Sequence, residues 1–201
     1  LYTCGNDQSC AALGAGVDDV GEVFCNFGTA LVVYALKDRP AAPATDDQIA
    51  GIGPLPGSWF LLALESECGN LVEGLARLLA PRGGVGRMID EALRAPVSAA
   101  MPQIVPVGGG RMDIRGLSAG CRREELARAL LEFYATRFGE ALAGVVGDGP
   151  APRRLRVGGG MSRSAPWRAF LEARHGVALE PTDIEHPGLV GVARAIARNP
   201  R

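Results

Sequence analysis

Residues 155–164, Leu155-Arg156-Val157-Gly158-Gly159-Gly160-Met161-Ser162-Arg163-Ser164, form the most informative stretch of the sequence. The apolar segment 155–157 predicts a strand, and the spacing in 165–174 predicts a helix. Three glycines at their junction leave the backbone bare enough for a flat ring or a ribose to lie against it. Each glycine adds entropy to the unfolded chain, so three in a row need a reason. A turn that binds a ligand and a loop without function are therefore about equally expected here.

The rest of the pattern predicts an α/β domain with a mixed β-sheet flanked by α-helices. The strongest helix covers residues 123–146, where apolar side chains recur every three or four positions. We expect strands at 1–4, 23–27, 30–34, 59–64, 155–157 and 177–179. Further helices are expected at 9–13, 70–79, 87–94, 165–174 and 188–197, and loops at 37–57 and 96–120, the latter with short strands.

The composition limits the classes of function. The chain has 201 residues, 47% of them hydrophobic, and 21 basic against 22 acidic side chains, which suits one globular domain. The resulting net charge of -1 provides no field that would collect nucleic acid or anionic lipid. No apolar run reaches the ~18 residues of a membrane span. Five scattered cysteines without a C-x-x-C pair favour free thiols, and we expect a cytoplasmic protein.

Two further sites precede the glycine triplet. In Gly5-Asn6-Asp7-Gln8, an aspartate at a helix start beside a second polar side chain can hold a hydroxyl group and take its proton, although a helix cap is the commoner role. In Phe27-Gly28-Thr29-Ala30, a tight hairpin would offer backbone N–H groups and a hydroxyl to a phosphate, although such a pair is more often only a turn. His175 and His186 lack metal-ligand spacing, so we expect surface or satisfied side chains.

Taken together and in this order, the three sites resemble those of the FGGY family of carbohydrate kinases. Gly5-Asn6-Asp7-Gln8 is similar to the family's catalytic aspartate motif, and Phe27-Gly28-Thr29-Ala30 to its phosphate hairpin. Residues 157–168 resemble its adenosine-binding strand, turn and helix, 126–132 its long helix, and 188–193 its closing helix. The resemblance implies a ribonuclease H-like fold of the actin and hexokinase superfamily, and residues 1–201 would be the C-terminal domain, with an incomplete first strand and no N-terminal domain.

The resemblance also implies a reaction, which is transfer of the terminal phosphoryl group of ATP, with Mg²⁺, to a hydroxyl of a sugar or polyol. Asp7 would be the catalytic base, and Asn6, Asp7 and Gln8 would bind the acceptor. The ATP-binding residues would be Gly28, Thr29, Gly158, Gly159, Gly160 and Met161. The partners would be the substrate and the protein's own N-terminal domain, with a homodimer left open, and no metal-ligating side chain is assigned.

The sequence differs from the family's pattern at two places. Pro106 to Arg115 replaces the usual Gly-Glu-Arg-x-Pro segment, so acceptor contacts there are not carried over, and we expect Gly108-Gly109-Gly110 to be loop. Ala30 stands where the family has serine, which removes one phosphate donor. The alternative is a nucleotide- or sugar-binding relative that has lost the chemistry, against which the intact Asp7 motif argues.

Overall fold

The computed structural model of the chain describes residues 6–66, 68–98, 101–108, 111–149, 152 and 155–198. The strand expected at 1–4, Gly5 of the first motif, and Gly109 and Gly110 lie outside the described residues. The helices are α1 (Asp7–Gly14), α2 (Cys68–Leu79), α3 (Gly84–Arg94), α4 (Arg123–Val146), the 3-10 helix η1 (Gly160–Arg163), α5 (Ala165–His175) and α6 (Pro187–Arg198). The strands are β1 (Val23–Phe27), β2 (Leu31–Lys37), β3 (Gln48–Ile52), β4 (Trp59–Glu65), β5 (Gln103–Gly108), β6 (Arg111–Arg115), β7 (Leu155–Gly158) and β8 (Glu180–Pro181).

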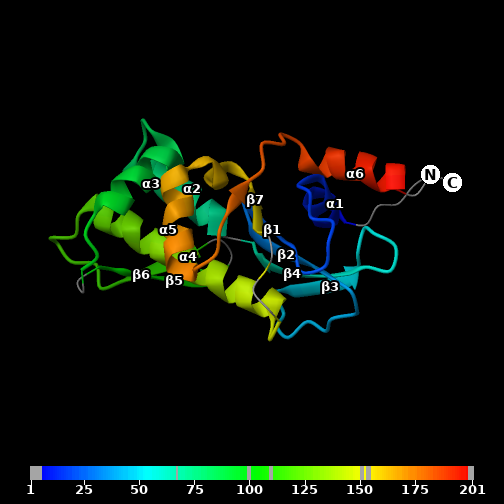
Figure 1. Cartoon of the computed structure of the whole chain (residues 1–201). Helices are drawn as coiled ribbons and strands as arrows, with labels where there is room; N and C mark the ends of the chain where they lie inside the picture. Colours follow the sequence, from blue (N-terminus) through cyan, green and yellow to red (C-terminus); the bar gives the residue numbers. More distant parts are fainter. Residues whose placement is uncertain are drawn as a thin grey trace.

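A mixed sheet with the strand order β3-β4-β2-β1-β7-β8 forms the centre of the molecule. β1 pairs antiparallel with β2, as the hairpin prediction requires, and parallel with β7 on its other side. Helices α1 and α6 lie on one face of the sheet, and α2 to α5 gather on the other (Figure 1). The predicted α/β class with a mixed, helix-flanked sheet is confirmed.

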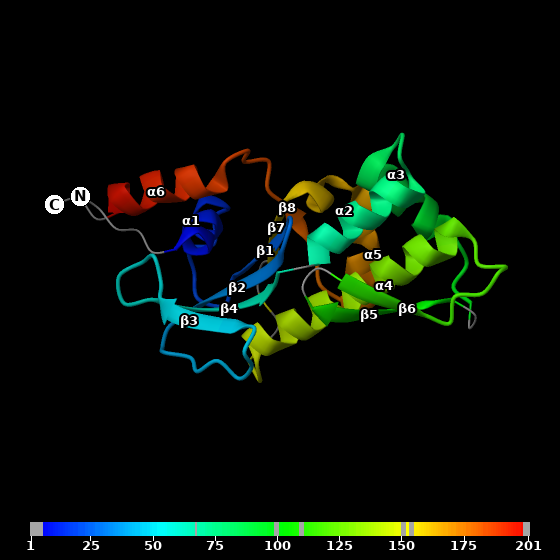
Figure 2. The same cartoon turned by 180° about the vertical axis from the view of Figure 1, so that it is seen from behind.

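Strand alternation explains why both faces are covered. Successive side chains of β1 point to opposite faces, so Cys25 and Phe27 join the core under α4 while Phe24 joins the core under α1. On the α4 side, the Phe27 ring packs edge-on against Tyr134 at 6.2 Å and Phe138 at 5.5 Å between centroids. The view from behind shows the same two layers on either side of the strands (Figure 2). The carboxyl end of β1 is therefore held from both sides.

Several predicted bounds were wrong. The segment 37–57, expected to be loop, contains β3, which pairs with β4 and forms an edge of the sheet as far as the described residues show. No strand forms at 177–179; the backbone reaches β7 one residue later, where Glu180 and Pro181 pair with Arg156 and Val157. β2 begins at Leu31 and continues to Lys37, because β4 pairs along its whole length.

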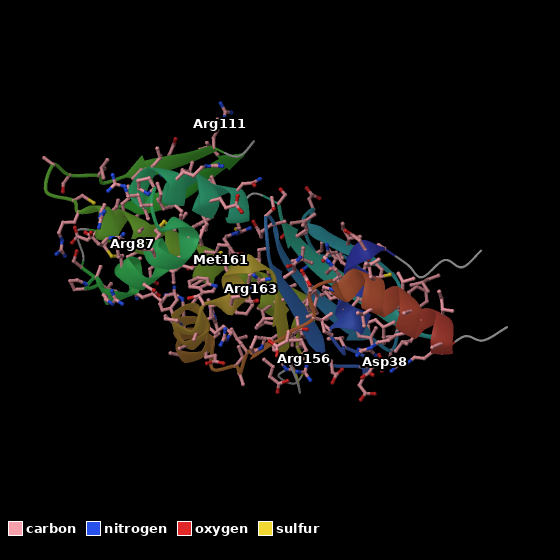
Figure 3. All side chains as sticks on the ribbon, turned by 90° about the horizontal axis from the view of Figure 1, so that it is seen from above. Asp38, Arg87, Arg111, Arg156, Met161 and Arg163 are labelled. Atoms are coloured by element: carbon pink, nitrogen blue, oxygen red, sulfur yellow. The ribbon has the colours of Figure 1, made fainter. Side chains whose placement is uncertain are left out.

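The β5–β6 hairpin stands apart from the main sheet and packs against α4. Gly108 ends β5, so this glycine is strand and not the expected loop. Arg111, which begins β6, projects from the edge of the molecule, away from Met161 and Arg163 (Figure 3). Within the described ranges, none of the helices combines the length and apolar content needed to cross a bilayer.

Candidate functional site

The Gly28-Thr29 turn joins β1 to β2 and is supported by the first turn of α2. Gly28 N donates to Ala30 O at 3.2 Å, and Asn70 N of α2 donates to Thr29 O at 3.2 Å. A methyl group at Gly69 would lie 1.9 Å from Gly28 O, so the helix reaches the turn only because residue 69 is glycine. Backbone contacts with α2 therefore hold the Gly28-Thr29 turn in place.

The glycine triplet follows β7 and lies beside the same turn. Asn26 and Gly158 are register partners in the parallel β1–β7 pair, which brings the ends of both strands together. Gly159 has φ +86°, and a methyl group there would lie 2.5 Å from the carbonyl carbon and oxygen of Phe27. Ser162 Oγ donates to Gly159 O at 2.7 Å and holds the start of η1 against the turn. Glycine is required at 159 for this close approach.

The two turns border one open hollow of about 740 Å³, which α2, α3, η1 and the start of α5 also line. This volume lies within the range of small-molecule sites, roughly 300 to 1,000 Å³. Of the predicted ATP-binding residues, Gly28, Thr29, Gly160 and Met161 line it. Gly158 and Gly159 do not, because they face Phe24 and the Phe27 carbonyl.

The far wall of the hollow was not predicted from the sequence. α2 and α3 contribute apolar Val72, Val85 and Ile89 together with the carboxylates of Glu73 and Asp90. Arg163, from η1, adds a cation to the lining and lies beside Met161 near the middle of the molecule (Figure 3). The hollow thus combines bare backbone, apolar walls and a few polar groups of both charges. The helices were visible in the sequence, but nothing in it showed which of their faces would meet the glycine turns.

Asp7 is the first residue of α1, and Asn6 is its N-cap. Asn6 Oδ1 accepts from Ser9 N at 2.7 Å, so the interpretation of Asp7 as a helix cap is wrong. Asp7 Oδ1 accepts from Gln8 N at 2.9 Å, and Asp7 is exposed. Gln8 is half-buried, and its Oε1 is buried without a hydrogen-bond partner among the described residues. Asp7 Oδ2 accepts from Gln8 Nε2 at 3.4 Å, and because Asp7 is exposed its carboxylate is still accessible to an incoming group.

Asp7 borders a different hollow, of about 510 Å³, formed with Cys10 and the start of α6. Glu185 and His186 share this second hollow, and the sequence had not placed them there. α1 and α6 approach closely, since a methyl group at Gly14 would lie 1.7 Å from Pro187 O. In this chain alone, Asp7 and the glycine turns therefore line separate hollows.

No family model matches the chain. The chain is 26% identical over 204 residues to the xylulose kinase of Escherichia coli K12, covering 96% of this chain and 41% of that protein. The crystal structure of xylulose kinase from Rhodospirillum rubrum matches with a TM-score of 0.78 and 26% identity, over 98% of this chain and 42% of that chain. The chain is a relative of the FGGY carbohydrate kinases.

Plasmodium falciparum glycerol kinase with ADP shares the fold, with a TM-score of 0.76 at 19% identity over 96% of this chain and 41% of that chain. The ribonuclease H-like fold implied by the FGGY resemblance is thereby confirmed. The chain spans about two fifths of the length of these FGGY relatives.

Neither histidine of this FGGY relative forms part of a metal site in the described residues. His175 Nε2 lies 2.9 Å from Ala135 O, so this ring is satisfied within the fold, as expected. The carboxylates of Asp18, Asp19 and Glu22 come within 4.8 Å of one another in the loop before β1. Glu22 Oε2 is already engaged by the backbone N–H groups of Asp18 and Asp19, and none of the three borders the glycine hollow.

Proposed function

We propose that the chain is the C-terminal, nucleotide-binding domain of an ATP-dependent kinase that phosphorylates a hydroxyl of a sugar or polyol. One observation carries the proposal: the Gly28-Thr29 turn and Gly160-Met161, more than a hundred residues apart in the sequence, line one hollow. Xylulose kinase and glycerol kinase, which the chain resembles, support the same class of acceptor.

The volume and the lining of the hollow support ATP as its ligand. Terminal phosphates would meet the backbone N–H groups and the Thr29 hydroxyl at the hairpin. The adenosine would lie along Gly160 and Met161, with Gly158 and Gly159 holding the turn in place. Apolar Val72 and Ile89 would cover the ring, and the Glu73 and Asp90 carboxylates could accept hydrogen bonds from ribose hydroxyls or the base.

Asp7 would act as the base, with Gln8 and Asn6 holding the acceptor hydroxyl. Phosphoryl transfer passes through a loose transition state, so orienting the hydroxyl and accepting its proton is most of what this carboxylate must do. Mg²⁺, bound through phosphate oxygens, would supply charge neutralisation. An N-terminal domain would close over both hollows and bring them into one crevice, so we expect the isolated chain to be nearly inactive.

The cysteines fit a protein of the cytoplasm. Cys25 and Cys68 are buried free thiols, and Cys121 is also free. Free thiols persist in a reducing compartment, and we propose the cytoplasm on this ground.

The direct test is ADP release by the full-length protein across a panel of sugars and polyols that includes xylulose, glycerol and gluconate. We expect release with at least one acceptor. ATP binding without release for any acceptor would support the alternative, a non-catalytic nucleotide- or sugar-binding relative. Absence of ATP binding in calorimetry would exclude both.

A further inference from the structure

The Asn26 side chain is a polar group at the end of β1 that the proposed function does not use. Asn26 pairs with Val32 of β2 and with Gly158 of β7, so it occupies the centre of the sheet beside both turns. Its side chain points to the same face as Phe24, because side chains alternate along a strand. That is the face covered by α1, the helix that begins with Asp7.

The Asn26 amide lies beside both glycine turns. A methyl group at Gly28 would lie 3.4 Å from Asn26 Oδ1 and 3.7 Å from Nδ2. A methyl group at Gly159 would lie 2.7 Å from Oδ1. The Gly159 turn therefore approaches this amide more closely than a larger residue would allow, whereas a methyl group at Gly28 would be in ordinary van der Waals contact with it. The three atoms nearest to the Gly28 position all belong to the Asn26 side chain.

Among the described residues, the Asn26 side chain makes no hydrogen bond. It is half-buried, in a strand whose other members are buried and apolar. A half-buried amide without a protein partner has hydrogen-bonding capacity to spare. A bound group that accepts hydrogen bonds would satisfy it.

We propose that Asn26 is a phosphate-binding residue. Its Nδ2 group donates a hydrogen bond to an oxygen of the terminal phosphoryl group of ATP held at Gly28 and Thr29. This inference rests on the proposed function and adds a donor on the α1 side of the turn. In the transfer, the bond from the terminal phosphorus to the bridging oxygen breaks and a bond to the acceptor oxygen forms. The acceptor proton passes to Asp7, ADP leaves, and the neutral amide keeps the group aligned throughout.

The experiment uses four variants of the full-length protein: Asn26→Ala, Asn26→Ser, Asn26→Asp and, as a control, Gln103→Ala. Gln103 is an exposed amide on β5, outside the hollow. Affinities for ATP and for ADP are measured by calorimetry, and kcat and KM by ADP release with any acceptor that supports turnover. Thermal unfolding of each variant reports on folding.

Loss of a hydrogen bond to a charged group should lower kcat of Asn26→Ala about ten- to hundredfold and weaken ATP binding about tenfold. ADP affinity should stay within about twofold, because the contact is to the terminal phosphate alone. Asn26→Ser, which keeps a short donor, should recover part of kcat, and Asn26→Asp should bind ATP most weakly because like charges repel. Gln103→Ala should match the wild type.

A purely structural role predicts a different pattern. Equal losses of ATP and ADP affinity, or unchanged kcat and ATP affinity in Asn26→Ala, would overturn the proposal. If Asn26→Ala folds poorly, Asn26→Leu provides the same test with an apolar side chain that suits the strand. A wild type that releases no ADP with any acceptor would refute the kinase function itself. The comparison of ATP with ADP affinity would still decide the role of Asn26.

Discussion

Gly69 of α2 lies so close to Gly28 that a methyl group on Gly69 would stand 1.9 Å from the Gly28 carbonyl oxygen. Such a distance is far inside van der Waals contact, so the helix and the turn fit together only as bare backbone. The neighbouring bond from Asn70 N to Thr29 O, at 3.2 Å, fixes the turn in the same place. Contacts with α2 thus set the position of the hairpin turn that lines the hollow.

This contact predicts that Gly69→Ala displaces the hairpin. The added methyl group meets backbone atoms that cannot give way, so we expect a loss of about 2 kcal/mol or more in the free energy of unfolding. ATP affinity should fall as well. The matched control is Gly74→Ala in the same helix, where a methyl group would have nothing within 4 Å. That variant should gain up to about 1 kcal/mol, because alanine favours helix. Equal effects of the two substitutions in denaturant unfolding would contradict this account.

Asp7→Asn removes the proposed base while keeping the shape of the side chain. In the full-length protein, kcat should fall about 10²- to 10⁴-fold, the range for loss of a general base. ATP affinity should change little, because Asp7 does not line the glycine hollow. Asp38→Asn is the control, since Asp38 is exposed and lies far from Met161 (Figure 3). Full turnover in Asp7→Asn would remove Asp7 from this role.

Arg137 of α4 ties the helix to the sheet through an ion pair with Glu65 of β4, and it also pairs with Glu140. The Glu65 side chain is only 18% exposed, so removal of its partner leaves a poorly solvated charge. Arg137→Ala should cost about 1 to 2 kcal/mol of unfolding free energy. Arg87→Ala, which breaks a more exposed pair with Glu91, should cost less than about 0.5 kcal/mol. Chemical denaturation measures both values, and a larger loss for Arg87→Ala would refute the prediction.

His175 makes stability depend on pH. Its ring packs against Phe138, and partial burial lowers the pKa of the imidazole below the ordinary value of 6.5. The unfolded chain therefore binds a proton more readily than the folded one, so the free energy of unfolding should decrease as pH falls below about 6.5. Unfolding midpoints between about pH 5 and 8 test this, and His175→Gln should flatten the low-pH slope. An unchanged slope in His175→Gln, or a loss of slope in exposed His186→Gln, would contradict it.

The succession of helices and strands along the chain could be predicted from the sequence, because each helix or strand depends on a local sequence signal. The predicted helix 123–146 has the observed bounds, since its apolar residues recur with helical spacing over the whole length. The hairpin around Gly28 could be predicted for the same reason, from two apolar runs and a short turn.

Features that depend on tertiary contacts could not be predicted. β3 was missed because Gly51 weakens its strand pattern, yet Gly51 is needed there, since a methyl group would lie 2.8 Å from the Phe60 ring. Asn6 and Asp7 are both good caps, and only the backbone shows that the helix begins after Asn6. The carboxylates of Glu73 and Asp90 carry no local signal, because their place in the hollow depends on how α2 and α3 pack.

The central claim is that the glycine hollow and Asp7 serve one reaction. A crystal structure of the full-length protein with Mg²⁺ and a non-hydrolysable ATP analogue tests it most directly. The account predicts the purine beside Gly160 and Met161, the terminal phosphate at Thr29, and the Asp7 carboxylate facing that phosphate across one crevice. A nucleotide bound elsewhere, or Asp7 separated from the terminal phosphate by the sheet, would contradict the account.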